Sequence, residues 1–194
     1  MQILEPIYNQ QTPKVTKHTE IDDTLVEFCG RLLNFASSCK TPVLAGLAAN
    51  QLSLDGDRVE ENVCFIMQGN EWITAVNPSI IKRSKEIYEN SQEGCLTWPN
   101  KMIIADRHKS IVVAYSDLEG SAKTIEVEEF QSVVWQHEIN HLNGIQETVV
   151  NPKSGKTYGP SVSSGEIIKS SKKIKPNERC PCDSGKKYKK CCGR

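Results

Sequence analysis

Residues 137–141 read His-Glu-Ile-Asn-His at the end of a segment with helical hydrophobic spacing. Residues four apart lie on one face of an α-helix, so His137 and His141 can bind one metal ion while Glu138 stands beside them as a base for a water molecule. The pentapeptide therefore predicts a helix that carries a hydrolytic metal site. The plainer alternative is a pair of histidines on a partly buried helix face without a metal.

The sequence before this motif predicts one α+β domain. The HExxH helix begins near Glu128 and runs toward Gly144, and an earlier amphipathic helix follows the capping side chain of Asp22 and ends at Thr41-Pro42. Between the helices, short β-branched runs alternate with turn signals, which predicts strands at 63–67, 72–76, 111–115 and 124–127. Strands followed by a helix indicate an α+β fold with antiparallel strands packed on a central HExxH helix.

The charges are balanced over the whole chain but segregated along it. Of the 24 basic and 24 acidic residues, ten basic and two acidic ones fall in 169–194, which leaves an acidic body and a basic tail. No apolar run approaches the ~18 residues of a membrane span, and the N-terminus has neither a basic nor an apolar signal region. We therefore expect a cytoplasmic protein without a membrane partner.

A hydrolytic metal site needs a third protein ligand and an open position for water. Downstream of His141 the chain offers no histidine, and Glu147 is too close along the chain to be a comfortable ligand. Upstream, Cys95 lies in a glycine-containing loop. Because an isolated cysteine is usually a packing residue, Cys95 alone is weak evidence for a third ligand.

Three segments carry a more specific pattern: GLAANQ at 46–51, EGCLT at 93–97 and QHEINHL at 136–142. In this order they resemble the three motifs of the peptide deformylase family, and the resemblance covers about residues 1–150. It implies a metal-dependent hydrolase that removes the N-formyl group from the N-terminal formyl-methionine of nascent polypeptides and releases formate.

The resemblance also implies the roles of individual residues. The metal ligands would be Cys95, His137 and His141. Glu138 would be the general acid and base, while Gln51 and the backbone N–H of Leu96 would donate hydrogen bonds to the oxyanion. One thiolate with two imidazoles suits Fe(II) or Zn(II). The metal of the family is Fe(II), with zinc, nickel or cobalt as substitutes.

The substrate would bind between the first and third motifs. By the resemblance, Gly46 and three side chains before the first histidine form the site for formyl-methionine: Phe130, Val133 and Val134. These three also read as the core-facing stripe of the helix, and both roles stay open. Three departures from the family motifs bear on the site. Leu44 stands where the family prefers glycine. Asn140 replaces the commoner Asp between the histidines, and Thr97 replaces Ser.

The C-terminal segment predicts a separate metal module. A short segment cannot build a core, so a structural Zn(II) would fold it through four closely spaced cysteines: Cys180, Cys182, Cys191 and Cys192. Their pattern resembles the SEC-C motif, over residues 176–194, which implies zinc binding and partner docking. Residues 151–175, rich in Ser, Gly, Lys and Pro, read as a flexible linker. The alternative is a disordered basic tail with incidental cysteines.

Three classes of function remain. Another HExxH hydrolase, such as a peptidase, would explain the helix but not Cys95 or Gln51. A binding protein on a catalytically retired deformylase scaffold would explain the tail but gives no reason to keep Glu138. An active deformylase explains all three residues. Its basic tail would then dock on the ribosome or another anionic partner, or would only aid solubility.

Overall fold

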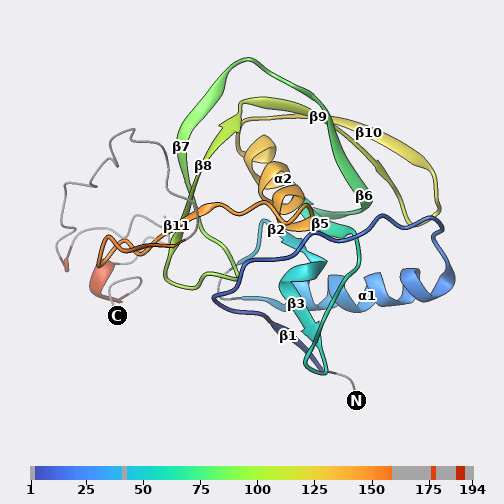
Figure 1. Cartoon of the computed structure of the whole chain (residues 1–194), viewed down its shortest axis with the longest axis horizontal. Helices are drawn as coiled ribbons and strands as arrows, with labels where there is room; N and C mark the ends of the chain where they lie inside the picture. The colour runs from blue at the N-terminus through green and yellow to red at the C-terminus, as the bar shows by residue number, and fades with distance from the viewer. Residues whose placement is uncertain (1–2, 41–42, 159–175, 178–186, 191–194) are drawn as a thin grey trace. The chain divides into compact units, whose positions relative to one another are not determined.

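The computed structural model describes residues 3–40, 43–158, 176–177 and 187–190 (Figure 1). The chain divides into two compact units, Met1–Ser161 and Val162–Arg194. In the second unit, the described residues include a short 3-10 helix, η2 (Tyr188–Lys190). Within the described part of the chain, no helix is long and apolar enough to cross a membrane.

Helix α1 (Asp23–Ser38) forms where the sequence predicts it. Asp22 is its N-cap, and the Asp22 carboxylate accepts a hydrogen bond from the Leu25 N–H at 2.8 Å, which satisfies a donor of the first turn. The buried side chains share one face: Leu25, Cys29, Leu32 and Ala36. This face packs into a hydrophobic cluster with sheet residues that include Leu47 and Phe65.

A five-stranded antiparallel sheet forms the frame of the first unit, in the order β10-β9-β6-β5-β2. Its strands are β2 (Gly46–Ala48), β5 (Val63–Gln68), β6 (Glu71–Arg83), β9 (Ser110–Ser116) and β10 (Ala122–Glu128). The four predicted strands are present, and β6 continues past its predicted end. The register of β6 against β9 shifts twice, which marks bulges that bend the long strand.

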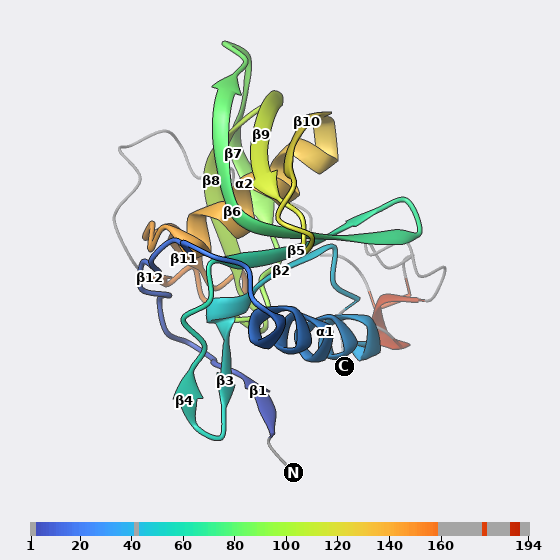
Figure 2. The same cartoon turned by 90° about the vertical axis from the view of Figure 1, so that its right-hand side faces the viewer.

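Strand β5 separates two hydrophobic cores because its successive side chains point to opposite faces of the sheet. Cys64 and Ile66 belong to the cluster around helix α2 (Glu129–Leu142), whereas Val63 and Phe65 belong to the cluster around α1. All four side chains are fully buried. Figure 2 shows the two helices on opposite sides of β5 and β2, so both faces of the sheet are covered here.

Two further sheets complete the first unit. One has the order β1-β3-β4 and the other β12-β11-β8-β7. Their strands are β1 (Leu4–Pro6), β3 (Leu52–Leu54), β4 (Asp57–Arg58), β7 (Ile87–Glu93), β8 (Met102–His108), β11 (Thr148–Val150) and β12 (Thr157–Tyr158).

The hairpin of β11 and β12 extends the folded unit past residue 150. Residues 151–158, which the composition assigns to a linker, form the turn of this hairpin and its second strand. Tyr158 packs on Trp98, with ring centroids 6.2 Å apart, and this contact accounts for the order of a polar segment. The rest of the predicted linker, 159–175, lies outside the described residues.

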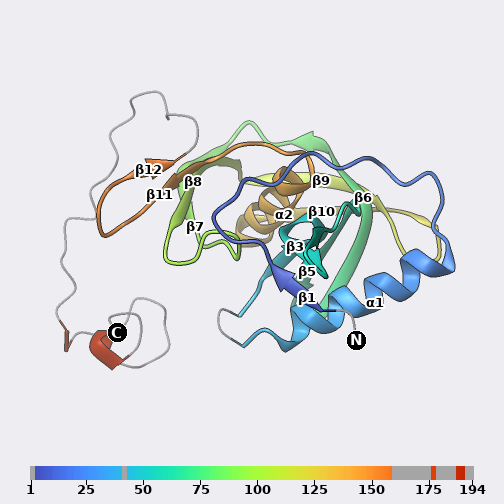
Figure 3. The same ribbon diagram turned by 60° about the horizontal axis from the view of Figure 1, so that its bottom comes forward.

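Helix α2 contacts strands of both larger sheets, among them β2, β5, β8 and β10 (Figure 3). Its side chains in the core are Val134, Trp135, Ile139 and Leu142. Phe130 is 64% exposed, so the interpretation of Phe130 as part of a core-facing stripe is wrong. Phe130 lies in the first turn of α2, one turn before the residues that meet the sheet. The α+β class, with mostly antiparallel strands and two α-helices in the described residues, is confirmed.

Candidate metal centre and active site

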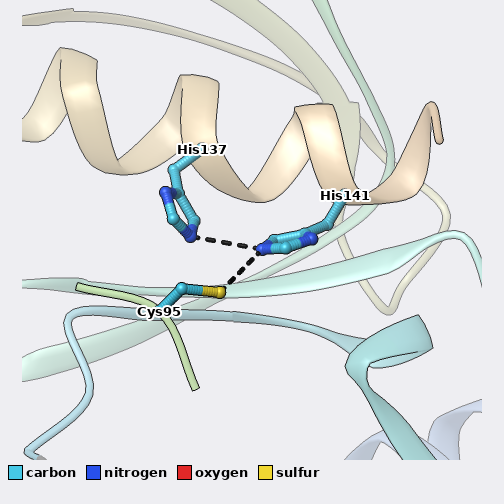
Figure 4. A group of neighbouring side chains, drawn as sticks. All are labelled: Cys95, His137 and His141. Carbon is cyan, nitrogen blue, oxygen red and sulfur yellow. Dashed lines mark hydrogen bonds between the residues drawn. The ribbon is translucent and has the colours of Figure 1, made fainter. Parts of the chain in front are cut away.

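Three side chains with metal-binding atoms converge beneath helix α2 (Figure 4). The ligand atoms of Cys95, His137 and His141 all lie within 4.8 Å of one another. His141 Nε2 lies 3.2 Å from Cys95 Sγ and 3.2 Å from His137 Nε2. A tetrahedral ion with bonds of about 2.0–2.3 Å separates its ligand atoms by roughly 3.3–3.8 Å. The three side chains therefore fit such an ion with small movements.

Hydrogen bonds orient both imidazole rings. His137 Nδ1 donates to Glu93 Oε2 at 2.7 Å. The Thr12 hydroxyl gives its hydrogen to the His141 carbonyl at 2.9 Å, so His141 Nδ1 donates to the Thr12 oxygen at 3.2 Å. Both Nδ1 atoms are occupied in this way, and both Nε2 atoms face the metal position.

The two histidines differ in their readiness to lose a proton. Burial, together with the charge of His137, lowers the pKa of His141 well below its ordinary value. Burial also opposes a charge on His137, but hydrogen bonds with Cys95 and Glu93 raise the pKa of His137. Because a metal ion binds the neutral form of each imidazole, protons and metal compete for this pair.

Gln51 and Cys95 come from distant segments and meet at the histidines. Cys95 follows the end of β7, and Gln51 is the last residue of a 3-10 turn, η1 (Ala49–Gln51). The Gln51 Oε1 accepts a hydrogen bond from the Ala48 N–H at 2.9 Å, which directs Nε2 toward the ligands. This Nε2 lies 3.5 Å from Cys95 Sγ and 3.2 Å from His141 Nε2. The first two motifs therefore contribute to one site.

Glu138 is almost fully buried beside Gly46. A Cβ at position 46 would lie 2.9 Å from Cγ1 of Val134 and still closer to Glu138, so the space at position 46 admits only a glycine. Burial raises the pKa of Glu138 to about 7, although the charge of His137 acts against it. The Oε2 atom of Glu138 has no hydrogen-bond partner among the described residues. Such a carboxyl can take up and return a proton near neutral pH.

The other residues singled out in the sequence lie at different depths. Val134 is buried beside Gly46, Val133 is half-buried, and Phe130 is exposed. Leu96 is half-buried against the cluster of α1, and Leu44 is buried in that same cluster. The leucine at position 44 therefore adds a side chain to the core of α1.

Two residues of the site carry no sequence signature. Thr12 lies in an irregular N-terminal segment, and Arg107 lies on β8 and is 2% exposed. Arg107 holds Glu93, a residue that the EGCLT motif does contain. Burial would raise the pKa of Glu93, but hydrogen bonds from Arg107 and His137 lower it to about 2. Glu93 therefore stays ionised behind the metal position.

The four predicted zinc ligands of the C-terminal metal module lie outside the described residues: Cys180, Cys182, Cys191 and Cys192. The described residues nearby are joined by a hydrogen bond from the Lys189 N–H to the Pro176 carbonyl at 2.9 Å.

Comparison with known proteins gives two matches along the chain. Residues 1–148 match the family model described as polypeptide deformylase, and residues 177–194 match the model of the SEC-C motif. A peptide deformylase from Borreliella burgdorferi is 32% identical over 134 residues, which span 67% of this chain and 75% of that protein. One from Thermotoga neapolitana is 29% identical over 143 residues, spanning 73% of this chain and 79% of that protein.

Solved structures of the same family share the fold. A peptide deformylase from Synechococcus elongatus, in complex with actinonin, superposes with a TM-score of 0.63 and 25% identity. The similarity covers 73% of this chain and 75% of that one. The peptide deformylase from Thermotoga maritima gives a TM-score of 0.59 and 26% identity, covering 73% of this chain and 95% of that one.

Proposed function

This chain belongs to the polypeptide deformylase family, and we propose that Cys95, His137 and His141 hold its catalytic metal while Glu138 acts as general acid and base. The chain is an enzyme that removes the N-formyl group from nascent peptides. Members of this family are metalloenzymes, and the three convergent side chains supply a suitable set of donors.

One observation carries the assignment of roles. The buried carboxyl of Glu138 lies next to the first metal-binding histidine; one of its oxygens has no hydrogen-bond partner in the part of the chain that the structure describes, and burial raises its pKa to about 7. A deformylase-like protein without catalytic activity would not need a buried proton acceptor at this position. An HExxH peptidase of another family would not explain why Cys95 lies with the two histidines at the metal position.

The donor set favours a borderline transition metal. Two imidazoles and one thiolate suit Fe(II) or Zn(II) and disfavour Mg(II) and Ca(II). We take Fe(II) as the catalytic metal, with zinc, nickel or cobalt as substitutes. When bound, the ion lowers the pKa of a water molecule and polarises the formyl oxygen.

The side chains of the protein perform the proton transfers. Glu138 takes a proton from the attacking water as the oxygen bonds to the formyl carbon. Gln51 Nε2 and the Leu96 N–H donate to the oxyanion that forms, and the Ala48 N–H keeps Gln51 in position for this task. Glu138 then gives its proton to the leaving amine as the C–N bond breaks. The products are formate and a free N-terminus.

The proposed substrate pocket lies beside Gly46, where the backbone approaches the catalytic carboxyl of Glu138 closely. Strand β2 is an edge strand of its sheet, and Gly46 at its start brings the backbone against Glu138. The methionine side chain would lie against Val133 and Val134, with Phe130 at the exposed entrance. In this arrangement α2 is the central element of the domain and supplies both the metal ligands and the pocket wall.

Formate release tests this function. The metal-loaded full-length chain is incubated with a short formyl-methionyl peptide, and formate and the new free amine are both quantified. Equal amounts of formate and amine are expected, with no cleavage of internal peptide bonds. The unformylated peptide is the control. Cleavage of internal bonds would identify a peptidase, and no reaction would identify a retired scaffold.

We propose that the catalytic domain of residues 1–150 is extended to Tyr158 by the β11–β12 hairpin, that a linker follows up to residue 175, and that residues 176–194 form a zinc module. The match to the SEC-C motif supports a structural Zn(II) at the four terminal cysteines. The excess of basic residues after residue 168 supports docking on an anionic partner. The ribosome is the leading candidate because formylated nascent chains emerge there, and this places the enzyme in the cytoplasm.

A further inference from the structure

We infer that Glu147 and Asn140 are positioning residues of the metal site, and that they act on His137 through Arg107 and Glu93. The inference rests on the metal site proposed above and extends it by two residues. The described contacts of the two side chains link them to each other and to Arg107, not to a metal ligand. Their influence passes through a chain of short contacts in the interior of the first unit.

Arg107 is the centre of this chain. Its Nε donates to Glu93 Oε1 at 2.8 Å and its Nη2 donates to Glu93 Oε2 at 2.7 Å. Its Nη1 lies 2.7 Å from Glu147 Oε1. Carboxylates therefore hold both ends of the guanidinium group, which fixes its rotation. Burial opposes the charge on Arg107, but the two carboxylates together raise the pKa of Arg107 above its ordinary value.

One oxygen links Arg107 to the metal ligand. Glu93 Oε2 accepts hydrogen bonds from Arg107 Nη2 and from His137 Nδ1, each at 2.7 Å. A rotation of the guanidinium would therefore move the atom that orients the His137 ring. Glu147 is the contact at the other end that opposes such a rotation.

Asn140 holds Glu147 in place. The Nδ2 of Asn140 donates to Glu147 Oε1 at 2.8 Å, and this is the same oxygen that binds Arg107 Nη1. Asn140 is one of the departures from the commoner pattern, which has Asp between the histidines. A carboxylate at position 140 would repel Glu147, whereas the amide donates to it. The chain thus combines an amide at 140 with a carboxylate at 147.

Loss of the Glu147 charge should weaken metal binding at the site. In Glu147→Gln, Nη1 of the buried Arg107 would face a neutral amide oxygen at best, and of the two described carboxylates only Glu93 would remain to balance its charge. Partners behind metal ligands typically change metal affinity by about 10–100-fold. We expect Glu147→Gln to weaken metal binding by about tenfold, at the lower end of this range, because three contacts, through Arg107 and Glu93, separate Glu147 from His137.

The test measures metal affinity in the full-length chain. Cobalt(II) is titrated into the protein, and the thiolate-to-cobalt absorption is recorded. The part of this absorption that is lost in Cys95→Ser reports on the catalytic site, and the remainder reports on the terminal cysteines. The variants are Glu147→Gln, Asn140→Ala and the exchange Asn140→Asp/Glu147→Gln. Glu126→Gln, an exposed change on β10, is the matched control and should bind as the parent does. The unfolding midpoint of each metal-free variant is recorded alongside.

Rescue by the exchange is the decisive result. The exchange keeps one carboxylate and one amide beside Arg107, so its affinity should return to within about threefold of the parent. Asn140→Ala, which changes no charge, should bind cobalt(II) several-fold more weakly than the parent. If Glu147→Gln does not fold, the affinity of Asn140→Ala tests the inference in its place. The inference is overturned if the single variants bind cobalt(II) as tightly as the parent does. It is also overturned if the double variant binds cobalt(II) no more tightly than Glu147→Gln does. A parent that shows no Cys95-dependent absorption would instead contradict the proposed metal site.

Discussion

A Cβ on Gly46 would stand 2.7 Å from Oε1 of Glu138. The start of an edge strand and the catalytic helix thus approach each other at one point, and the missing side chain of Gly46 provides the room for the carboxyl. The conformation of Gly46 does not itself demand glycine, since its φ is not among the positive values. The demand comes from two side chains of α2, Glu138 and Val134, which both lie within 3.0 Å of such a Cβ.

Gly46→Ala should therefore impair catalysis without removing the metal. The new methyl group displaces the carboxyl, and a misplacement of about 1 Å at a reacting group typically costs about 10²-fold in rate. The measurement is kcat/KM for formate release, with metal content determined on the same samples. Gly30→Ala is the control, since no atom of the described residues lies within 4 Å of that Cβ. It should keep parental activity and stabilise α1 by about 1 kcal/mol. A parental rate in Gly46→Ala would contradict the expected crowding.

Cys95→Ser should lower the metal content of the protein by about one ion per chain. A neutral hydroxyl is a much poorer ligand for a soft metal than a thiolate. Elemental analysis of the full-length protein measures this, and the zinc of the terminal module should remain. Cys39→Ser changes a half-buried cysteine at the end of α1 and should alter neither metal content nor activity. Unchanged stoichiometry in Cys95→Ser would make Cys95 a packing residue.

The elements with a strong hydrophobic pattern were predictable from the sequence. The three-residue strand β2 was not predicted. Both α-helices and the other four strands of the five-stranded sheet carry apolar residues at a helical or β period. Strand β7 does not: its segment reads Ile-Tyr-Glu-Asn-Ser-Gln-Glu, and only Glu93 is buried. It forms through backbone pairing with β8, which no local pattern records.

Some residues of the candidate site were likewise predictable from the sequence, and others were not. Cys95, His137 and His141 converge as the motifs predict. Thr12 and Arg107 were not predictable because their roles arise only when distant segments meet. A lone arginine in a strand normally reads as exposed, and only the fold reveals that carboxylates surround Arg107.

Acid should destabilise the metal-free protein in a defined pH window through Glu93. The pKa of Glu93 is lowered in the folded state to about 2 from an ordinary value of 4.5. The unfolded chain thus binds the proton first, and the stabilisation present above pH 4.5 is lost as the pH falls toward 2. Urea unfolding at several pH values, followed by tryptophan fluorescence, measures this. Glu93→Gln should be less stable at neutral pH by about 3 kcal/mol, with a shallower loss in acid. An equally steep loss in Glu93→Gln would assign the acid sensitivity to other groups.

Truncation after Gly159 should separate catalysis from docking. Hydrolysis of a short formyl peptide should stay nearly parental, since all predicted catalytic residues precede the cut. Co-sedimentation of the full-length enzyme with ribosomes should fall with salt, with a log–log slope of roughly −0.7 to −0.9 per phosphate contact, and the truncated enzyme should not co-sediment. Equal co-sedimentation of both forms, or of neither, would exclude the ribosome as the partner of the tail.

The turnover of Glu138→Gln tests the central claim most directly. Gln keeps the shape of the side chain but cannot accept a proton, and position 138 is not a metal ligand. The variant should therefore retain its metal, as shown by elemental analysis, and release formate from formyl-methionyl peptide about 10²–10⁴-fold more slowly than the parent. A metal-replete Glu138→Gln protein that deformylates at the parental rate would contradict the assignment of Glu138 as the acid and base.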